Sequence, residues 1–362
     1  MRILYFSRDY TPHDYRFLTA LAQTPHQVFY LRLERRGNAT EDRALPAEIK
    51  LVPWEGGQQS ASLKDGSRLL LGVRRVLQKI KPDIVHAGPI QTAAFLTALS
   101  GFRRLVSVSW GYDLLYDVQR GSLWRWAARY TLKRSAAFVG DCDTVRQQAI
   151  KYGMRPERIV TFPWGVDLTH FTPGAVEKPA DAPFTILSTR AWEPLYGVEV
   201  IARAFAQASQ AHPELQLVMT GHGSLASRLR QIFERAGVSE KVLFPGHIRQ
   251  ADLPRYYRSA DLYVSASHSD GSSISLLEAM ACGIPVLVSA IPGNCEWVQE
   301  GVQGWLFPDG DAQALAQAIS HAAENRPALA GLGKAARSQA EKRANWNLNF
   351  PRLLQAYEMA MA

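Results

Sequence analysis

The sequence predicts an α/β protein built from two parallel sheets with helices on both faces. Short apolar runs alternate with segments of helical periodicity along the whole chain, which is typical of βαβ units. This pattern occurs twice, and a stretch rich in proline and glycine, residues 165–183, separates the two halves as a candidate hinge. A chain of 362 residues is also long enough for two large domains.

The expected strands are short runs rich in aliphatic and aromatic residues. In chain order they are residues 2–7, 27–33, 83–88, 104–110 and 136–141, then 185–190, 215–221, 241–246, 262–267 and 285–290. Intervening segments such as residues 17–23, 201–210 and 225–237 place apolar residues at helical spacing. The order strand, helix, strand therefore favours parallel pairing in each half.

Composition indicates an ordinary globular protein, with 47% hydrophobic and 20% charged residues. No run of about 18 apolar residues occurs, and the N-terminus enters a strand without a secretory leader pattern. We expect a cytoplasmic protein that does not span the membrane. The three cysteines, Cys142, Cys282 and Cys295, lack CxxC spacing, so we expect reduced thiols.

Charge is distributed unevenly along the chain, whose net charge is +8. Residues 1–170 contain 25 Lys+Arg against 15 Asp+Glu, and the remainder contains 16 against 18. A basic first half suits an anionic acceptor or the anionic inner face of a membrane, although a solvated basic face is the simpler explanation. We expect no nucleic-acid partner, because the basic excess is spread out and no recognised motif accompanies it.

Residues 269–289, SDGSSISLLEAMACGIPVLVS, contain the most informative motif. Two acids, Asp270 and Glu278, lie eight positions apart, and the residues between them are glycine, serine and apolar residues. One explanation for Glu278 is a capping box with Ser275, because S-x-x-E is the sequence of that motif. Asp270 has no such explanation, since it precedes small residues whose backbone amides can meet a ligand.

Ligands of open parallel sheets bind beyond the carboxyl ends of the strands. In the second half, the positions after expected strands are Arg190, residues 221–223, residues 246–249 and the stretch that begins at residue 268. We therefore expect a site that these four positions share, in a cleft between the two sheets.

The motif and its flanks resemble the family 4 (group 1) glycosyltransferases, whose signature is E-x7-E. Residues 241–267 resemble the family segment before the signature, and residues 291–319 resemble the segment after it. Residues 164–173, WGVDLTHFTP, resemble the interdomain element GVD-x-x-F-x-P. The resemblance covers most of residues 160–322, whereas the first half is similar mainly in its strand spacing and in SWGYD.

The resemblance implies the GT-B fold, with two Rossmann-like domains whose parallel sheets face a central cleft. We expect an acceptor-side domain over residues 1–170, completed by a C-terminal helix over residues 346–362. The nucleotide-sugar-binding domain is expected over residues 171–345.

The resemblance also assigns roles at the donor site. Glu278 is expected to bind the ribose hydroxyls, Asp270 the sugar hydroxyls, and Arg190 the leaving phosphate. The family commonly has a lysine five or six residues after this arginine, and this chain has Tyr196 there. The other expected donor-binding residues are Gly271, Ser272, Ser273 and Ile274 around the diphosphate, Ile248 and Arg249 near the base, and Gly221 and Gly223.

The first half offers candidates on the acceptor side. The family often has a Gly-Gly loop after the first strand, whereas this chain has SRDYTPHDYRF. We expect its polar residues to contact the acceptor or a phosphate, or else to form only a loop and a helix cap. The candidates are His13, Asp14 and Arg16 in this segment, His86 after a later strand, and Trp110, Gly111 and Asp113 in SWGYD. Trp110 replaces the usual histidine of that element, and His86 is equally compatible with a buried structural role.

Two further patterns have ordinary explanations. Asp141-Cys142-Asp143 looks like a DxD metal motif, but Asp143 precedes a helical pattern and is expected to be an N-cap. We expect neither a metal nor a cofactor, because no cluster of ligand residues has metal spacing and the nucleotide-sugar is a substrate. Residues 123–134, LWRWAARYTLKR, could lie on anionic lipid, although aromatic residues at helical spacing more often pack into a core.

The resemblance, taken with these observations, implies a metal-independent hexosyltransferase that moves a sugar from a nucleotide-diphosphate donor to an acceptor hydroxyl. Retention of configuration rests on the resemblance alone. A UDP-sugar is favoured and GDP-mannose comes next, in glycan, glycolipid or cell-surface polysaccharide synthesis. Two alternatives remain open. One is a phosphorylase or sugar-phosphate synthase on the same fold, and the other is a non-catalytic protein that binds a sugar or a membrane surface.

Overall fold

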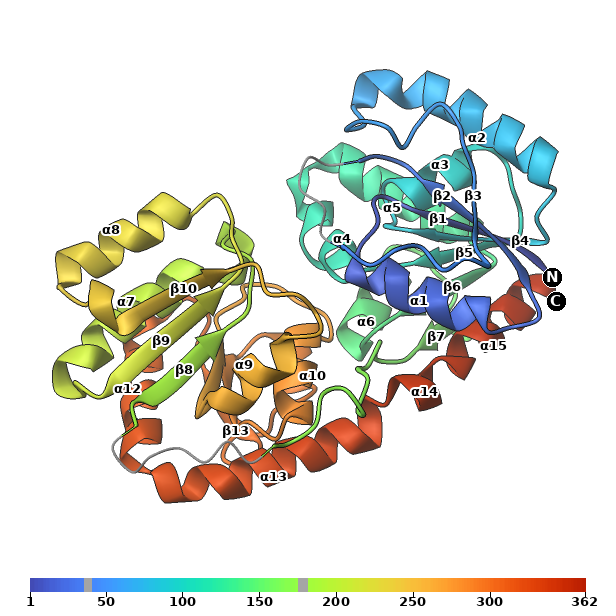
Figure 1. Cartoon of the computed structure of the whole chain (residues 1–362). Helices are drawn as coiled ribbons and strands as arrows, with labels where there is room; N and C mark the ends of the chain where they lie inside the picture. The colour runs from blue at the N-terminus through green and yellow to red at the C-terminus, as the bar shows by residue number, and fades with distance from the viewer. Residues whose placement is uncertain (36–40, 175–181) are drawn as a thin grey trace. The chain divides into compact units, whose positions relative to one another are not determined.

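The computed structural model describes residues 1–35, 41–174 and 182–362 (Figure 1). The chain forms two compact units, the first comprising Met1–Phe162 and Phe350–Ala362, the second comprising Pro163–Asn349. The candidate hinge, residues 165–183, includes residues 175–181, which lie outside the described residues. Within the described parts of the chain, no helix is both long and apolar enough to cross a membrane.

The first unit contains a seven-stranded sheet in the order β3-β2-β1-β4-β5-β6-β7, with every neighbouring pair parallel. Its strands are β1 Arg2–Ser7, β2 Gln27–Arg32, β3 Lys50–Leu51, β4 Ile84–Gly88, β5 Leu105–Val108, β6 Ala137–Gly140 and β7 Ile159–Thr161. The strand order changes direction at the neighbouring pair β1 and β4, because β2 and β3 lie beyond β1 while β5, β6 and β7 lie beyond β4. The connections that leave β1 and β4 therefore begin next to each other.

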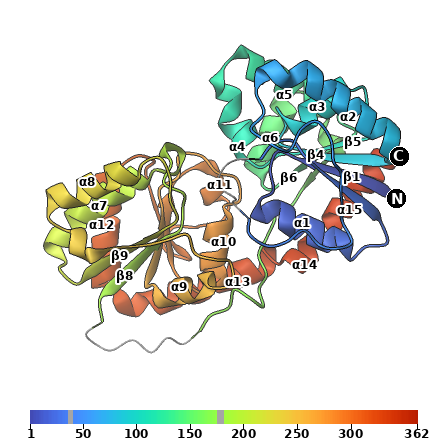
Figure 2. The ribbon, with the colours of Figure 1, turned by 45° about the horizontal axis from the view of Figure 1, so that its top comes forward.

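Helices cover both faces of this sheet, which explains why its inner strands are mostly apolar and buried along almost their whole length rather than alternating. The helices are α1 Pro12–Ala22, α2 Gly66–Ile80, α3 Ala93–Leu99, α4 Tyr112–Leu115, α5 Ser122–Arg134, α6 Asp143–Lys151 and α15 Pro351–Met361, with 3-10 turns η1 Leu63–Asp65, η2 Asp117–Arg120 and η3 Pro156–Arg158. Leu4, Phe6 and Val85 point to the face that α2 and α3 cover. Helices α1 and α15 lie on the opposite face (Figures 1 and 2).

The expected C-terminal helix is interrupted. Residues Trp346–Asn349 form α14 in the second unit, and α15 begins at Pro351 in the first unit. Proline suits the first turn of a helix but cannot continue one, so the chain makes a new start at this position. Helix α15 is fixed to the first unit by Tyr357, whose hydroxyl lies 2.8 Å from Nδ1 of His86, and by Arg158, which donates to the Met359 carbonyl at 2.6 Å.

The second unit contains a six-stranded parallel sheet in the order β10-β9-β8-β11-β12-β13. Its strands are β8 Phe184–Ser188, β9 Leu215–Thr220, β10 Val242–Gly246, β11 Leu262–Ser265, β12 Val286–Ser289 and β13 Gly304–Phe307. Its helices are α7 Val198–Ala211, α8 Ala226–Ala236, α9 Leu253–Ser259, α10 Ile274–Ala281, α11 Pro292–Cys295, α12 Ala312–Glu324, α13 Arg326–Arg343 and α14, with η4 Pro194–Tyr196 and η5 Ser239–Lys241.

Two apolar clusters hold this sheet between its helices. Helices α7, α8 and α12 pack on one face, where Phe184, Leu217 and Val264 are buried. Helices α10 and α13 pack on the other, against Leu187 and Val288. Figure 1 shows the two helical layers on either side of the strands. Because the sheet is parallel throughout, the loops that follow β8, β9, β10, β11 and β12 all emerge at one edge.

Every strand expected from the sequence is present, and three short strands were not expected. These are β3, β7 and β13, which have four residues or fewer. The predicted N-cap at Asp143 is wrong by one residue, because Cys142 is the N-cap of α6 and Asp143 is its first helical residue. The backbone at Cys142 is extended, as an N-cap requires, although its side chain makes no capping hydrogen bond.

Candidate active site

The candidate site of the second unit lies at the carboxyl edge of its sheet. Arg190 follows β8, Gly221 follows β9, and Ile248 follows β10. Asp270 lies in the loop after β11, and that loop leads directly into α10, which contains Glu278. The topology thus assembles the predicted donor-site residues on one edge of one sheet.

Arg190 is the most constrained side chain of this edge. One of its terminal nitrogens donates to Asp270 at 2.7 Å, and the other donates to the hydroxyls of Ser273 at 2.8 Å and Ser275 at 3.0 Å. The aromatic ring of Tyr196 lies 4.1 Å from the guanidinium carbon, in a cation–π arrangement. The predicted catalytic cation is therefore held in place from three sides.

Burial and charge act in opposite directions on Arg190. Burial by itself lowers the pKa of the guanidinium, but the carboxylate of Asp270 more than offsets this, and the pKa is raised above its ordinary value. Arg190 is consequently a permanent positive charge. Its buried Nε has no hydrogen-bond partner among the described residues.

Tyr196 occupies the place where the family commonly has a lysine, and the structure shows what it does there. It supplies an aromatic face to Arg190 in place of a second positive charge. Glu193, in the same loop, accepts hydrogen bonds from the backbone and the hydroxyl of Ser224. The β8 loop is thereby tied to the β9 loop.

The start of α10 faces the same edge. Ser273 is its N-cap, and the Ser273 side chain makes no capping hydrogen bond. Ser272 accepts a hydrogen bond from the indole of Trp297 at 3.1 Å, and Tyr263 donates to Ser275 at 2.8 Å. The predicted residues Gly271, Ser272 and Ser273 are buried, so the small side chains are packed while the helix N-terminus keeps its partial positive charge.

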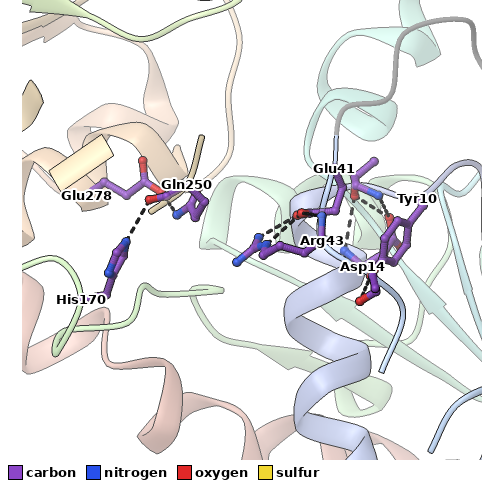
Figure 3. Close-up of polar contacts among 9 residues, drawn as sticks. Tyr10, Asp14, Glu41, Arg43, His170, Gln250 and Glu278 are labelled. Atoms are coloured by element: carbon purple, nitrogen blue, oxygen red, sulfur yellow. Dashed lines mark hydrogen bonds and ion pairs between the residues drawn. The ribbon is translucent and has the colours of Figure 1, made fainter. Parts of the chain in front are cut away.

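Glu278 does not form the capping box that its sequence allows. Because the N-cap is Ser273, Ser275 already lies inside the helix, and Glu278 is one turn further along. Its carboxylate accepts from the Gln250 amide at 3.2 Å and from the Tyr257 hydroxyl at 2.9 Å. Nε2 of His170 lies 2.9 Å from the main-chain carbonyl oxygen of Gln250 (Figure 3).

This network holds a carboxylate that is only 5% exposed. Burial, with the neighbouring Glu278 charge as a further cause, raises the pKa of Tyr257 well above its ordinary value, so the tyrosine stays a donor. Sequence reasoning missed Gln250, Tyr257 and His170. The sequence signal for Gln250 and Tyr257 was that they lie in residues 241–267, which resemble the family segment before the signature. The signal for His170 was that it lies in the interdomain element, residues 164–173.

Two glycines of the β9 loop are required, Gly221 by its backbone conformation and Gly223 by close packing. The amide of Gly221 donates to the Gly246 carbonyl at 2.7 Å, with φ of +91° at Gly221. A Cβ atom at Gly223 would lie 2.4 Å from the Trp192 carbonyl oxygen. Ile248 is half-buried beside this loop, whereas Arg249 is exposed and pairs with Asp252 at 3.0 Å.

In the first unit, Asp14 is a capping residue. It forms a reciprocal capping box with Thr11 at the start of α1, and it accepts a hydrogen bond from the Tyr5 hydroxyl at 3.0 Å. Burial raises the pKa of Asp14 to about 6, against the effect of these hydrogen bonds. The alternative of a loop and a cap therefore describes Asp14, and a direct acceptor contact does not fit its burial.

The neighbouring candidates are more accessible. His13 stacks on Trp110 with ring centres 5.1 Å apart, and Arg16 is half-buried on the next turn of α1. Arg43 forms an ion pair with Glu41 at 2.7 Å (Figure 3). The Arg43 guanidinium also lies over the ring of Tyr15. These contacts fix the segment that begins at Glu41 against α1.

Asp113 and His86 are core residues rather than surface residues. Asp113 is fully buried and accepts from the Ile90 and Leu114 amides and from the Ser109 hydroxyl, while burial raises its pKa to about 6. Gly111 begins the same turn with φ of +83°, a conformation that favours glycine. The Asp113 side chain therefore shapes the loop between β4 and α3.

His86 is 1% exposed and stacks on Tyr5 with ring centres 4.2 Å apart. Burial lowers its pKa to about 3 from an ordinary value of 6.5, so the ring is neutral at physiological pH. Of the two uses expected for His86, the buried structural role is the one that the structure supports.

Among the residues that the structure describes, no group of three or more His, Cys, Asp or Glu side chains could hold a metal ion. The cysteines are free thiols, with Cys142 and Cys282 buried and Cys295 exposed. Burial, followed by the charge of Glu278, raises the pKa of Cys282 to about 12, so this thiol stays protonated beside the candidate site.

Comparison with known proteins relates these features to a class. Residues 175–339 match the family described as glycosyl transferases group 1, and residues 13–170 match Glycosyltransferase Family 4. The chain is 30% identical over 287 residues to WcaL of Escherichia coli (strain K12), a glycosyltransferase named for colanic acid biosynthesis, covering 75% of this chain and 70% of the relative.

Solved structures share the fold at low sequence identity. Sucrose-phosphate synthase from Thermosynechococcus elongatus has a TM-score of 0.82 and 19% identity, covering 99% of this chain and 98% of that one. Anabaena HepE in complex with UDP-glucose has a TM-score of 0.79 and 20% identity, covering 99% of both. The two Rossmann-like units are those of a GT-B glycosyltransferase. The chain belongs to the group 1, family 4 glycosyltransferases.

Replacing His86 with asparagine should reduce the loss of stability on acidification. The unfolded chain binds a proton near pH 6.5 and the folded chain only near pH 3, so stabilisation by the neutral ring is complete above pH 6.5 and is lost as the pH falls. The expected slope is about 1.4 kcal/mol per pH unit for one proton. Urea unfolding between about pH 6 and about pH 4.5 measures it.

The asparagine amide can take the position of Nδ1 beside Tyr357, which keeps the contact with α15. Asp14 and Asp113 are present in both proteins, so their opposite pH dependence cancels in the difference. Equal slopes for the native protein and the variant would show that His86 titrates in the folded state.

Proposed function

We propose that this glycosyltransferase transfers a hexose from a nucleotide-diphosphate sugar to an acceptor hydroxyl with retention of configuration, without a metal or cofactor. A UDP-sugar is the favoured donor and GDP-mannose the next. The observation that carries the proposal is the arrangement around α10. This helix contains Glu278, and its first residues hold Arg190 through Ser273 and Ser275.

The two charges suit two different parts of such a donor. A carboxylate accepts hydrogen bonds from both hydroxyls of a ribose diol, and Glu278 is already oriented by Gln250 and Tyr257. A guanidinium and the amides of a helix N-terminus suit a diphosphate. The crystal structures of HepE with UDP and with UDP-glucose support this class of donor, because the fold is shared.

In the proposed reaction, the bond between the anomeric carbon and the phosphate oxygen breaks with its electron pair on that oxygen. The acceptor hydroxyl attacks from the same face, and its proton passes to the departing phosphate. Arg190 and the α10 N-terminus stabilise the negative charge that develops there. Asp270 keeps the guanidinium oriented. The product should keep the anomeric configuration of the donor, and NMR of its anomeric proton would reveal inversion.

Replacing Glu278 with glutamine should abolish the thermal stabilisation by UDP. In the native protein, UDP at 100 times its dissociation constant stabilises by about 2.7 kcal/mol, and the proposal expects the same shift with magnesium and with EDTA. A carboxylate has about four acceptor positions on two oxygens, and Gln250 and Tyr257 each donate to one of these oxygens. Glutamine has a single acceptor oxygen and presents an NH₂ donor in place of the other, where the proposal needs an acceptor for a ribose hydroxyl. Differential scanning fluorimetry with UDP, GDP and ADP measures the effect.

The matched control is Glu324→Gln, the same change at an exposed position at the end of α12. It should keep the full shift. A Glu278→Gln protein that responds to UDP like this control would contradict the ribose assignment. Stabilisation by GDP alone would instead favour a GDP-sugar donor.

Replacing Arg190 with lysine should lower kcat by about 100-fold to 1,000-fold, the usual cost of losing one donor to developing charge. The single ammonium nitrogen of lysine cannot reach Asp270, Ser273 and Ser275 together, as the two terminal nitrogens of the Arg190 guanidinium do. The KM for the donor should change by less than tenfold, because Glu278 is unaffected. Steady-state kinetics with the donor identified by fluorimetry gives both constants.

Arg228→Lys on the surface of α8, where Arg228 pairs with Glu199, is the corresponding control and should keep native kinetics. If Arg190→Lys raises KM without lowering kcat, Arg190 binds the donor but does not act on the departing charge.

A further inference from the structure

The first unit contains a cavity of about 510 Å³ that the donor chemistry does not use. It lies among α2, α3 and α5, which pack together on one side of the sheet (Figures 1 and 2). Its volume is in the range of about 300–1,000 Å³ that is usual for small-molecule sites. The cavity therefore has the size of a ligand site.

Most of the cavity wall is apolar. Leu33 and Leu69 are buried in the wall, and Phe95 and Trp124 contribute aromatic surface. The apolar surface continues outwards at Leu123, which lines the cavity and is 54% exposed. Trp126, 50% exposed, packs edge-on against Phe95. An apolar wall that opens to solvent beside exposed apolar residues suits a hydrocarbon chain.

The two arginines that line this cavity, Arg8 and Arg120, each form an ion pair with a carboxylate of the protein. Arg8 pairs with the buried Glu34 at 2.7 Å, and Glu34 also accepts from the Ala61 amide at 2.9 Å. Arg120 pairs with Asp117 at 3.5 Å and lies over the Trp124 ring. Because each cation has its own carboxylate, the cavity does not require a charged head group on its ligand.

Gln91 shows what the polar part of the ligand must offer. Its amide nitrogen donates to the Asp113 carbonyl at 2.6 Å, which fixes the orientation of the side chain. The residue lines the cavity and is 8% exposed, and its Oε1 has no hydrogen-bond partner among the described residues. A buried acceptor without a partner calls for a donor such as a hydroxyl group.

We propose that this cavity binds a neutral amphiphile, with its hydrocarbon chain between α2, α3 and α5 and a hydroxyl of its sugar head donating to Oε1 of Gln91. The chemical class is a glycolipid. That this glycolipid is the acceptor of the transfer rests on the proposed function, whereas the binding site itself does not.

Isothermal titration calorimetry with n-octyl and n-decyl β-D-glucoside, each below its critical micelle concentration, tests the proposal. Each buried methylene should tighten binding about fourfold, so the decyl compound should bind roughly fifteenfold tighter than the octyl compound. Glucose should bind much more weakly than either. Equal affinity for both chain lengths would overturn the proposal.

Two variants add bulk at the cavity. Ser67→Trp changes an exposed residue at the mouth, and Ala127→Leu enlarges a buried residue in the wall. Each should weaken decyl glucoside binding at least tenfold. Leu71→Trp is the matched control, since Leu71 lies on the same helix, is 51% exposed and does not line the cavity. Native affinity in both cavity variants would place the ligand elsewhere.

Gln91→Met tests the hydroxyl contact, because methionine keeps the length of the side chain without the acceptor. Affinity for decyl glucoside should fall roughly fivefold while the ratio between chain lengths is kept. An unchanged affinity would remove Gln91 from the proposal. Glu278→Gln should bind decyl glucoside normally, so loss of UDP binding and loss of glycolipid binding report separately on the two sites.

Discussion

The ion pair between Arg190 and Asp270 organises the candidate active site. It joins the loop after β8 to the loop after β11, two neighbouring strands of one sheet. Ser273 and Ser275 accept from the same guanidinium, so the start of α10 is fixed by it as well. The pair is partly buried, with the Arg190 side chain 12% exposed and the Asp270 side chain 20% exposed, so breaking it would leave a poorly solvated charge without its partner. The candidate active site at the carboxyl edge of this sheet is thus held in place by the protein's own contacts.

The sequence was sufficient for the architecture, because parallel strands and amphipathic helices have local periodicities. The sequence did not predict strands as short as β13, because so few residues show no clear periodicity. It also did not predict the break between α14 and α15, which depends on the single residue Pro351. The signature predicted Asp270 and Glu278, and the position after an expected strand predicted Arg190 at the same edge. The sequence could not predict that Asp270 and Arg190 bind each other, since such a pairing depends on the geometry of two loops 80 residues apart.

Carboxylates illustrate the limit of reading residue types alone. Asp14 was a candidate because it follows the first strand, and Asp113 because SWGYD resembles a family element, yet both are buried. Asp14 bonds to Thr11 in its own loop, and Asp113 accepts from the Ile90 amide in the loop after β4. Glu278 looked like a possible cap, yet it joins Gln250 and Tyr257, which come from other segments. For Asp113 and Glu278 the role depends on partners that no short pattern contains, whereas the Asp14 cap is a local pattern with Thr11. Gln91 drew no attention, because its unpaired oxygen is visible only in three dimensions.

The return of α15 to the first unit has a consequence for biosynthesis. His86 of β4 meets Tyr357 across 271 residues, and the entire second unit lies between them in the chain. During translation the face of the first sheet that α15 covers must stay open until the second unit has been made. Domains that are continuous in sequence can finish folding as they emerge. This one cannot, and its uncovered strands are the part of the nascent chain that most needs protection from aggregation.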